Sequence, residues 1–171
     1  MMYGCKAGDV KPQRENYTPD YAIYHNVSRI LSHLQTIANR FQKYVHLDLS
    51  FRSRLQRPQP VLRITNFTRM QEQEQLLKSH TARILLSYGE HSREFLPIES
   101  MFALLENVTG GLGPDASVSQ IAYSSFVVNN IDLHIVAMLN PDGRVYIENS
   151  GWFLYLLFVI STRFTLRIFY G

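Results

Sequence analysis

Gly89-Glu90-His91-Ser92-Arg93-Glu94-Phe95 follows the strand-like run Arg83–Tyr88 and leads into a helix-like pattern. A histidine and a carboxylate at this spacing, at the exit of a buried strand, can both point at one spot above the sheet edge. A neutral imidazole and a carboxylate are groups that Zn²⁺ accepts as ligands. Because open α/β sheets bind ligands at the carboxyl ends of their strands, the stretch indicates that His91 and Glu94 form part of a metal site.

A strand–helix–strand unit surrounds this stretch. Apolar residues over 95–105 recur at helical spacing, and Pro97 is tolerated in a first turn. The helix should end near Asn107, before the Gly-rich segment 110–114. After a polar segment with a short helix, residues 131–139 form a mostly apolar run of strand length. Two apolar strands joined by a helix predict parallel pairing in a covered sheet.

The preceding part of the chain predicts a helix and a hairpin. Thr18-Pro19-Asp20 is typical of a helix start, and apolar spacings of three and four predict an amphipathic helix over 19–41. Strict alternation over 45–52 predicts a half-buried strand, and a Pro-bounded turn leads to a second strand over 61–67. Two adjacent strands joined by a short loop predict an antiparallel hairpin. Residues 69–80 are polar and predict a surface connection.

These elements predict an α/β fold. Its mixed sheet combines the antiparallel hairpin with a parallel βαβ unit, and helices lie on both faces. We expect a polar lead-in over 1–16, a domain over 17–152 and an apolar tail over 153–171.

The remaining histidines have no predicted chemical role. His25 and His33 fall on the polar side of the helix 19–41, so we expect them to be solvated. His80 is expected in a loop, and His134 is expected to be hydrogen-bonded within its strand.

Composition excludes some classes of function. The chain has 171 residues, enough for one domain with a core. Its net charge of +3 is spread without a Lys/Arg block, which does not indicate a nucleic-acid partner. Cys5 is the only cysteine, so an intrachain disulfide and a cysteine-based metal site are excluded.

Signals for the cell compartment conflict. The first residues lack an apolar h-region, so no signal peptide is recognisable. Asn-x-Ser/Thr sequons at Asn16, Asn26, Asn66 and Asn107 hint instead at a secreted ancestry. The compartment therefore stays open between cytoplasmic and secreted.

The apolar tail raises the alternative of a small tail-anchored membrane protein. Residues 153–160 are continuously apolar, but Arg163 and Arg167 follow. Each arginine near the centre of a membrane helix costs about 2.5–3.5 kcal/mol. The apolar core is also too short for a span, so a membrane partner is disfavoured.

Two motifs carry a resemblance to a known family. Residues 89–94 resemble the zinc-binding signature of the carboxypeptidase A-like zinc metallocarboxypeptidases. Asn140-Pro141-Asp142-Gly143, which turns the chain sharply after a hydrophobic strand, resembles the Asn-Pro-Asp-Gly turn of those enzymes. The resemblance covers residues 17–152 and therefore implies an incomplete, amino-terminal part of a carboxypeptidase-like domain.

The resemblance implies a hydrolase, a metalloprotease that removes C-terminal residues from peptides or proteins. In the family, two histidines and a glutamate hold Zn²⁺, a glutamate acts as general base, and an arginine binds the substrate carboxylate. His91 and Glu94 match the first two zinc ligands. Arg93 matches the motif arginine beside the metal, which implies a substrate-binding role.

Other parts of the family's machinery have no match. The family's third ligand, carboxylate-binding pair and general base lie well downstream of the Asn-Pro-Asp-Gly turn, and this chain ends at Gly171. Glu148 is expected to be a solvated loop residue, and Arg163 and Arg167 lie outside the resemblance. No catalytic residue is therefore assigned.

Two function hypotheses follow, in addition to the tail-anchored alternative. In the first, the full-length form is a zinc-dependent metallocarboxypeptidase. In the second, this chain is a truncated, non-catalytic form that lacks the third ligand, the carboxylate-binding residues and the general base.

Overall fold

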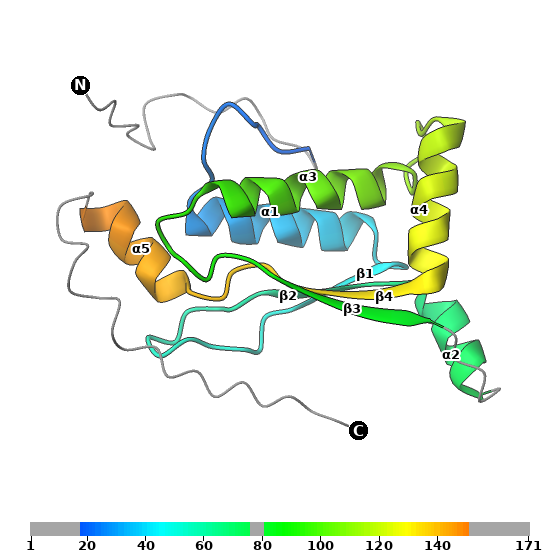
Figure 1. Cartoon of the computed structure of the whole chain (residues 1–171), viewed down its shortest axis with the longest axis horizontal. Coiled ribbons are helices and arrows are strands. Elements are labelled where there is room, and N and C mark those ends of the chain that lie inside the picture. The colour runs from blue at the N-terminus through cyan, green and yellow to red at the C-terminus, as the bar shows by residue number, and fades with distance from the viewer. Residues whose placement is uncertain (1–17, 76–80, 151–171) are drawn as a thin grey trace.

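The computed structural model describes residues 18–75 and 81–150, which form one mixed sheet and five helices (Figure 1). The sheet has four strands in the order β1-β2-β4-β3. The strands are β1 (Val45–Asp48), β2 (Val61–Ile64), β3 (Ala82–Ser87) and β4 (Ile131–Val136). The helices are α1 (Val27–Arg40), α2 (Phe67–Gln75), α3 (Leu96–Gly110), α4 (Val118–Asn130) and α5 (Pro141–Ser150).

The pairing pattern confirms the predicted α/β class. β1 and β2 form the antiparallel hairpin, in which Val45 lies opposite Ile64. β3 and β4 pair in parallel, as expected for a βαβ unit, although two helices, α3 and α4, lie between them in the chain. β2 joins these two units by antiparallel pairing with β4.

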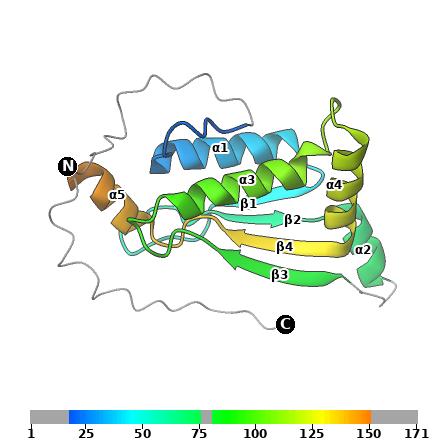
Figure 2. The same ribbon diagram turned by 45° about the horizontal axis from the view of Figure 1, so that its top comes forward.

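The core lies between one face of the sheet and the pair α1 and α3 (Figure 2). Alternation along β2 and β4 directs Leu62 and Ile135 into this core, where both are fully buried. Leu34 of α1 and Phe102 of α3 pack there from the helix side. α2 follows β2 and lies beyond the end of the sheet, on the side away from α1 and α3 in Figure 1.

The helix over 19–41 begins later than predicted. α1 starts at Val27, and the side chain of Asn26 caps it by accepting a hydrogen bond from the Arg29 amide at 2.9 Å. The prediction that His25 and His33 are solvated is wrong. They are 0% and 4% exposed because α3 packs over them, and both rings stack edge-on against Phe102.

Two segments expected to be irregular or short are helical. Residues 67–75 form α2, within what was predicted as a polar surface connection. α4 runs for 13 residues and starts with a capping box between Ser117 and Gln120. The sequence of α2 is mostly polar, and α4 mixes Val, Ile, Tyr and Phe with Ser, Gln and Asn, so neither helix shows the clear apolar stripe that would predict its length.

The prediction that the parallel strands are covered on both faces is wrong for β3. This strand forms an edge of the described sheet, and Ile84 and Leu85 are 38% and 62% exposed. The apolar run of β3 is like that of a buried strand. The residue pattern of one strand does not show whether that strand forms an edge of the sheet, so the prediction failed here.

Several predictions lie outside the described residues: the lead-in 1–16 with Asn16, the loop residue His80, and the tail 153–171 with Arg163 and Arg167. Within residues 18–75 and 81–150, no helix has the length and apolar character needed to cross a membrane.

Candidate functional site

The two sequence motifs meet where β3 and β4 end. The backbone amide of Leu139 donates to the carbonyl of Tyr88 at 2.9 Å, and the amide of Asn140 donates to Gly89 at 3.0 Å. These bonds extend the parallel β3–β4 pairing beyond the strands. The loop 89–95 and the segment 140–143 therefore form one structural unit at the carboxyl edge of the sheet, the edge where such folds bind ligands.

Glycines allow this close approach. Gly89 has φ +68°, a conformation that favours glycine, and a Cβ there would press on Met138 and Ile98. A Cβ on Gly143 would collide with the hydroxyl of buried Ser92 and lie 3.0 Å from the Asn140 amide group. The Gly143 amide instead donates to Asn140 Oδ1 at 2.9 Å. Gly143 is thus needed for the loop 89–95 to pack against the start of α5.

His91 and Glu94 lie at the two ends of a single turn before α3, which we call the motif turn. The Glu94 amide donates to the His91 carbonyl at 3.0 Å, and the side chains of His91, Arg93 and Glu94 are all exposed. The predicted strand-to-helix junction is present, and it delivers both predicted donors to one surface region. Their role as metal ligands stays a prediction, as does substrate binding by Arg93.

The donor set at this turn suits zinc in kind but is incomplete in number. An imidazole and a carboxylate are zinc ligands, and a stable site needs at least a third. Over residues 18–75 and 81–150, no three His, Cys, Asp or Glu side chains lie together as a metal site. The described part therefore offers two candidate donors rather than a closed metal site.

The Asn140–Gly143 segment does more than turn the chain, because Pro141 is the first residue of α5. The Asp142 carboxylate accepts hydrogen bonds from Ser53 Oγ at 2.7 Å and Arg57 Nη1 at 2.9 Å. Burial by itself would raise the pKa of Asp142, but these bonds outweigh burial and hold that pKa below its ordinary value. Asp142 thus ties the loop between β1 and β2 to α5.

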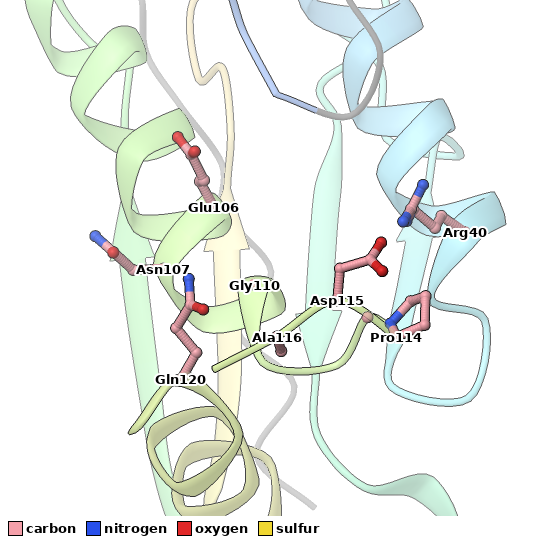
Figure 3. A pocket seen from close by; sticks show the side chains of 9 residues that line it. Arg40, Glu106, Asn107, Gly110, Pro114, Asp115, Ala116 and Gln120 are labelled. Atoms are coloured by element: carbon pink, nitrogen blue, oxygen red, sulfur yellow. The ribbon is translucent and has the colours of Figure 1, made fainter. Parts of the chain in front are cut away.

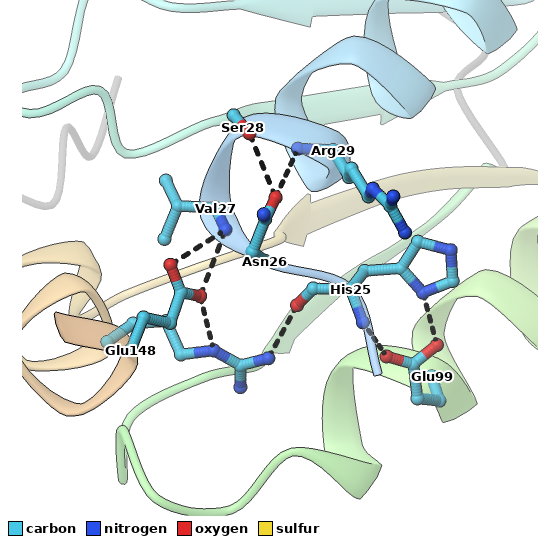
Figure 4. Close-up of polar contacts among 8 residues, drawn as sticks. His25, Asn26, Val27, Ser28, Arg29, Glu99 and Glu148 are labelled. Carbon is cyan, nitrogen blue, oxygen red and sulfur yellow. Dashed lines mark hydrogen bonds and ion pairs between the residues drawn. The ribbon is translucent and has the colours of Figure 1, made fainter. Parts of the chain in front are cut away.

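A buried polar cluster lies behind the motif turn (Figure 4). His25 Nδ1 lies 2.7 Å from Glu99 Oε2, and the His25 amide donates to Glu99 Oε1 at 2.9 Å. Arg144, only 1% exposed, donates to the His25 carbonyl at 2.6 Å and to Glu148 Oε1 at 3.0 Å. Sequence reasoning missed this cluster, which joins α5, the entry to α1 and the first turn of α3.

The prediction that Glu148 is a solvated loop residue is wrong. Glu148 lies on α5 and accepts a hydrogen bond from the Val27 amide at 3.0 Å (Figure 4). Burial raises the pKa of Glu148 despite its bonds to Arg144, and burial lowers the pKa of Arg144. The spacing of Arg144 and Glu148, one helical turn apart, was the one signal in the sequence.

A shallow polar pocket lies at the opposite end of α3 from the motif turn. Figure 3 shows its lining, in which Arg40 and Asp115 lie on one side and Gln120 on the other. Glu106, Asn107 and Gly110 of the pocket lie in the second half of α3, whereas the candidate metal site precedes the first residue of this helix. None of the predicted site residues lines the pocket.

Comparisons with known proteins agree with the fold and the motifs. The family model described as zinc carboxypeptidase matches residues 30–156. No curated protein matches the sequence of this chain.

Similar solved structures include carboxypeptidase A from Helicoverpa armigera, with TM-score 0.62 and 19% identity over 84% of this chain and 31% of that one. Bovine thrombin-activatable fibrinolysis inhibitor, in complex with tick carboxypeptidase inhibitor, has TM-score 0.56 and 18% identity over 76% and 36%. A metallo-carboxypeptidase from Burkholderia cenocepacia has TM-score 0.57 and 16% identity over 71% and 29%. At these identities the structural likeness shows the fold alone, and this chain spans about a third of the length of those proteins.

Proposed function

Because this chain belongs to the zinc carboxypeptidase family, we propose that it provides the amino-terminal part of a zinc-dependent carboxypeptidase domain. The complete domain would remove C-terminal residues from peptides or proteins. His91 and Glu94 would supply two of its zinc ligands.

One observation supports this assignment most strongly. The loop 89–95 and the segment Asn140–Gly143, which are far apart in sequence, are hydrogen-bonded to each other at the carboxyl edge of the sheet. That edge is where α/β folds place ligands. His91 and Glu94 lie on its exposed side, accessible to an ion and to a substrate.

Each motif side chain has a chemical task in this proposal. The His91 imidazole and the Glu94 carboxylate would donate to Zn²⁺, which when bound would polarise a scissile carbonyl and lower the pKa of a bound water. Arg93 is exposed one residue before Glu94, so its guanidinium would lie close to the ion. A guanidinium suits a carboxylate through paired N–H donors, which favours contact with the substrate's C-terminal carboxylate.

A second candidate is that this chain by itself is not catalytic. The observation that favours it is the absence of any three metal-ligating side chains in one place within the described residues. Two ligands would hold zinc weakly, and weak zinc binding would remove much of the stabilisation of the transition state.

A zinc titration of the purified chain, followed by calorimetry, tests the assignment of the ligands. We expect weak binding that is lost in both His91→Ala and Glu94→Ala and is unchanged in His46→Ala, a strand histidine exposed away from the motif turn. Binding that survives both motif substitutions would disprove the site. Zinc-dependent release of terminal residues from a peptide with a free C-terminus would refute the non-catalytic candidate.

A further inference from the structure

We propose that Arg144 is a positioning residue that holds the turn carrying His91 and Glu94 in place through the ring of Phe95. This inference rests on the proposed function, because it assigns Arg144 to support of the zinc donors. Arg144 itself is buried and would not touch the ion or the substrate.

The contact between Arg144 and Phe95 carries the inference. The guanidinium carbon of Arg144 lies 3.7 Å from the centroid of the Phe95 ring. Other cation–ring contacts in the described residues, such as those of Arg40, Lys43 and Arg63, have distances of 5.4–5.6 Å. A buried guanidinium stacked at such a short distance fixes the position of the ring strongly.

Phe95 connects this contact to the motif turn. It directly follows Glu94 and is the N-cap residue of α3, and its phenyl ring cannot cap the helix as a polar side chain would. Tyr24 packs against the same ring, with centroids 5.5 Å apart. Arg144 and Tyr24 therefore hold the ring of the residue next to Glu94, and Arg144 is the buried part of that support.

The position of Arg144 is fixed by two further contacts. It donates to the His25 carbonyl at 2.6 Å and to Glu148 at 3.0 Å, and Glu148 is itself held by the Val27 amide at 3.0 Å. Moving a buried charge away from these acceptors would leave it without compensation, which is costly. A lysine keeps the charge but loses the planar fork that makes both bonds and the stack.

Hydrogen exchange of the metal-free chain tests the positioning role directly. The Glu94 amide donates to His91, and the Ile98 amide donates to Phe95 at 3.2 Å. In Arg144→Lys, we expect these two amides to exchange on the order of tenfold faster relative to amides in the centre of α1, which neither Arg144 nor Arg63 bonds through a side chain. The matched control is Arg63→Lys, because Arg63 makes a paired contact with Asp132 in the sheet, away from the turn.

The control separates a local effect from a general loss of stability. Arg63→Lys should leave the ratio of turn exchange to exchange in the centre of α1 unchanged even where the global stability falls, because Arg63 pairs with Asp132 in the sheet. If Arg144→Lys raises exchange equally throughout the chain, or leaves the turn protected, the positioning role is wrong.

Zinc binding provides a second readout that distinguishes this inference from the proposed function. Arg144→Lys should weaken binding by about 10–100-fold, the usual cost of losing support behind a ligand. Phe95→Leu should weaken it similarly, and the double variant should add little to either single variant, because both remove one contact. If the unmodified chain does not bind zinc, the proposed ligands fail, while the exchange experiment still decides the role of Arg144.

Discussion

The two faces of the sheet are stabilised in different ways. On the face toward α1 and α3, Leu62 and Ile135 are fully buried among apolar side chains. On the other face, Arg63 lies opposite His134, and both are about a third exposed. Between them Asp132 is buried, with its carboxylate 2.8 Å from Arg63 Nε and 3.2 Å from His134 Nε2.

The difference shows that one set of strands can bury apolar side chains on one face and a compensated charge on the other. The helix-side face gains stability from apolar area removed from water. The other face buries one carboxylate, and it does so at acceptable cost because basic groups surround it. The prediction that His134 is hydrogen-bonded within the sheet is confirmed by its contact with Asp132.

The largest effect is expected on the apolar face. Leu34→Ala should lower the free energy of unfolding by about 2–5 kcal/mol, because Leu34 is fully buried and the cavity would not refill. Leu85→Ala, at a leucine that is 62% exposed on the other face, should change it by about 0.5 kcal/mol or less. Urea unfolding of both variants measures the difference, and equal losses would contradict the contrast between the faces.

A smaller loss of stability is expected when the charge of Asp132 is removed. Asp132→Asn should cost about 1–3 kcal/mol, because Arg63 and His134 lose the carboxylate that pairs with them. Asp115→Asn, at an exposed position, serves as the control and should be nearly neutral. A neutral Asp132→Asn in urea unfolding would show that the cluster contributes nothing to stability.

Acid should remove the contribution of the same carboxylate. Burial alone would raise the pKa of Asp132, but the hydrogen bonds and charges of Arg63 and His134 hold it below its ordinary value. A lowered carboxyl pKa stabilises the fold above the unfolded value of about 3.9, and this stability is lost as pH falls through the folded pKa. Thermal midpoints between pH 6 and pH 2 should fall less steeply in Asp132→Asn. Parallel curves for the variant and the original chain would refute this linkage.

The smallest effect on stability should accompany a clear change in self-association. β3 is an edge strand of the described sheet, and Leu85 is exposed on it. Leu85→Lys should leave the urea midpoint nearly unchanged but reduce concentration-dependent association, because a charged edge disfavours pairing with another chain. Analytical ultracentrifugation measures this, with Arg83→Lys as the control. Identical sedimentation of Leu85→Lys and the original chain would argue against association through this edge.

Local patterns in the sequence were sufficient to place the four strands and the turn that carries His91 and Glu94. Alternation in residues 45–52 predicted the first hairpin strand, although β1 ends at Asp48, and helical spacing after Phe95 predicted α3 with Pro97 in its first turn. The sequence also placed His91 and Glu94 at a strand-to-helix junction. These signals are local, since a period of two or of 3.6 residues follows from the backbone geometry of one element.

Contacts between distant segments decided the rest. The sequence determined the strands, α3 and the placement of His91 and Glu94, because each depends on neighbours within one or two turns. The tertiary structure alone decided that the buried His25 and Arg144 and the half-buried Glu148 lie together, because partners such as Val27 and Glu148 are distant in sequence. A buried charge is recognised only when the groups that compensate it are in place, and no periodicity in a single segment records that.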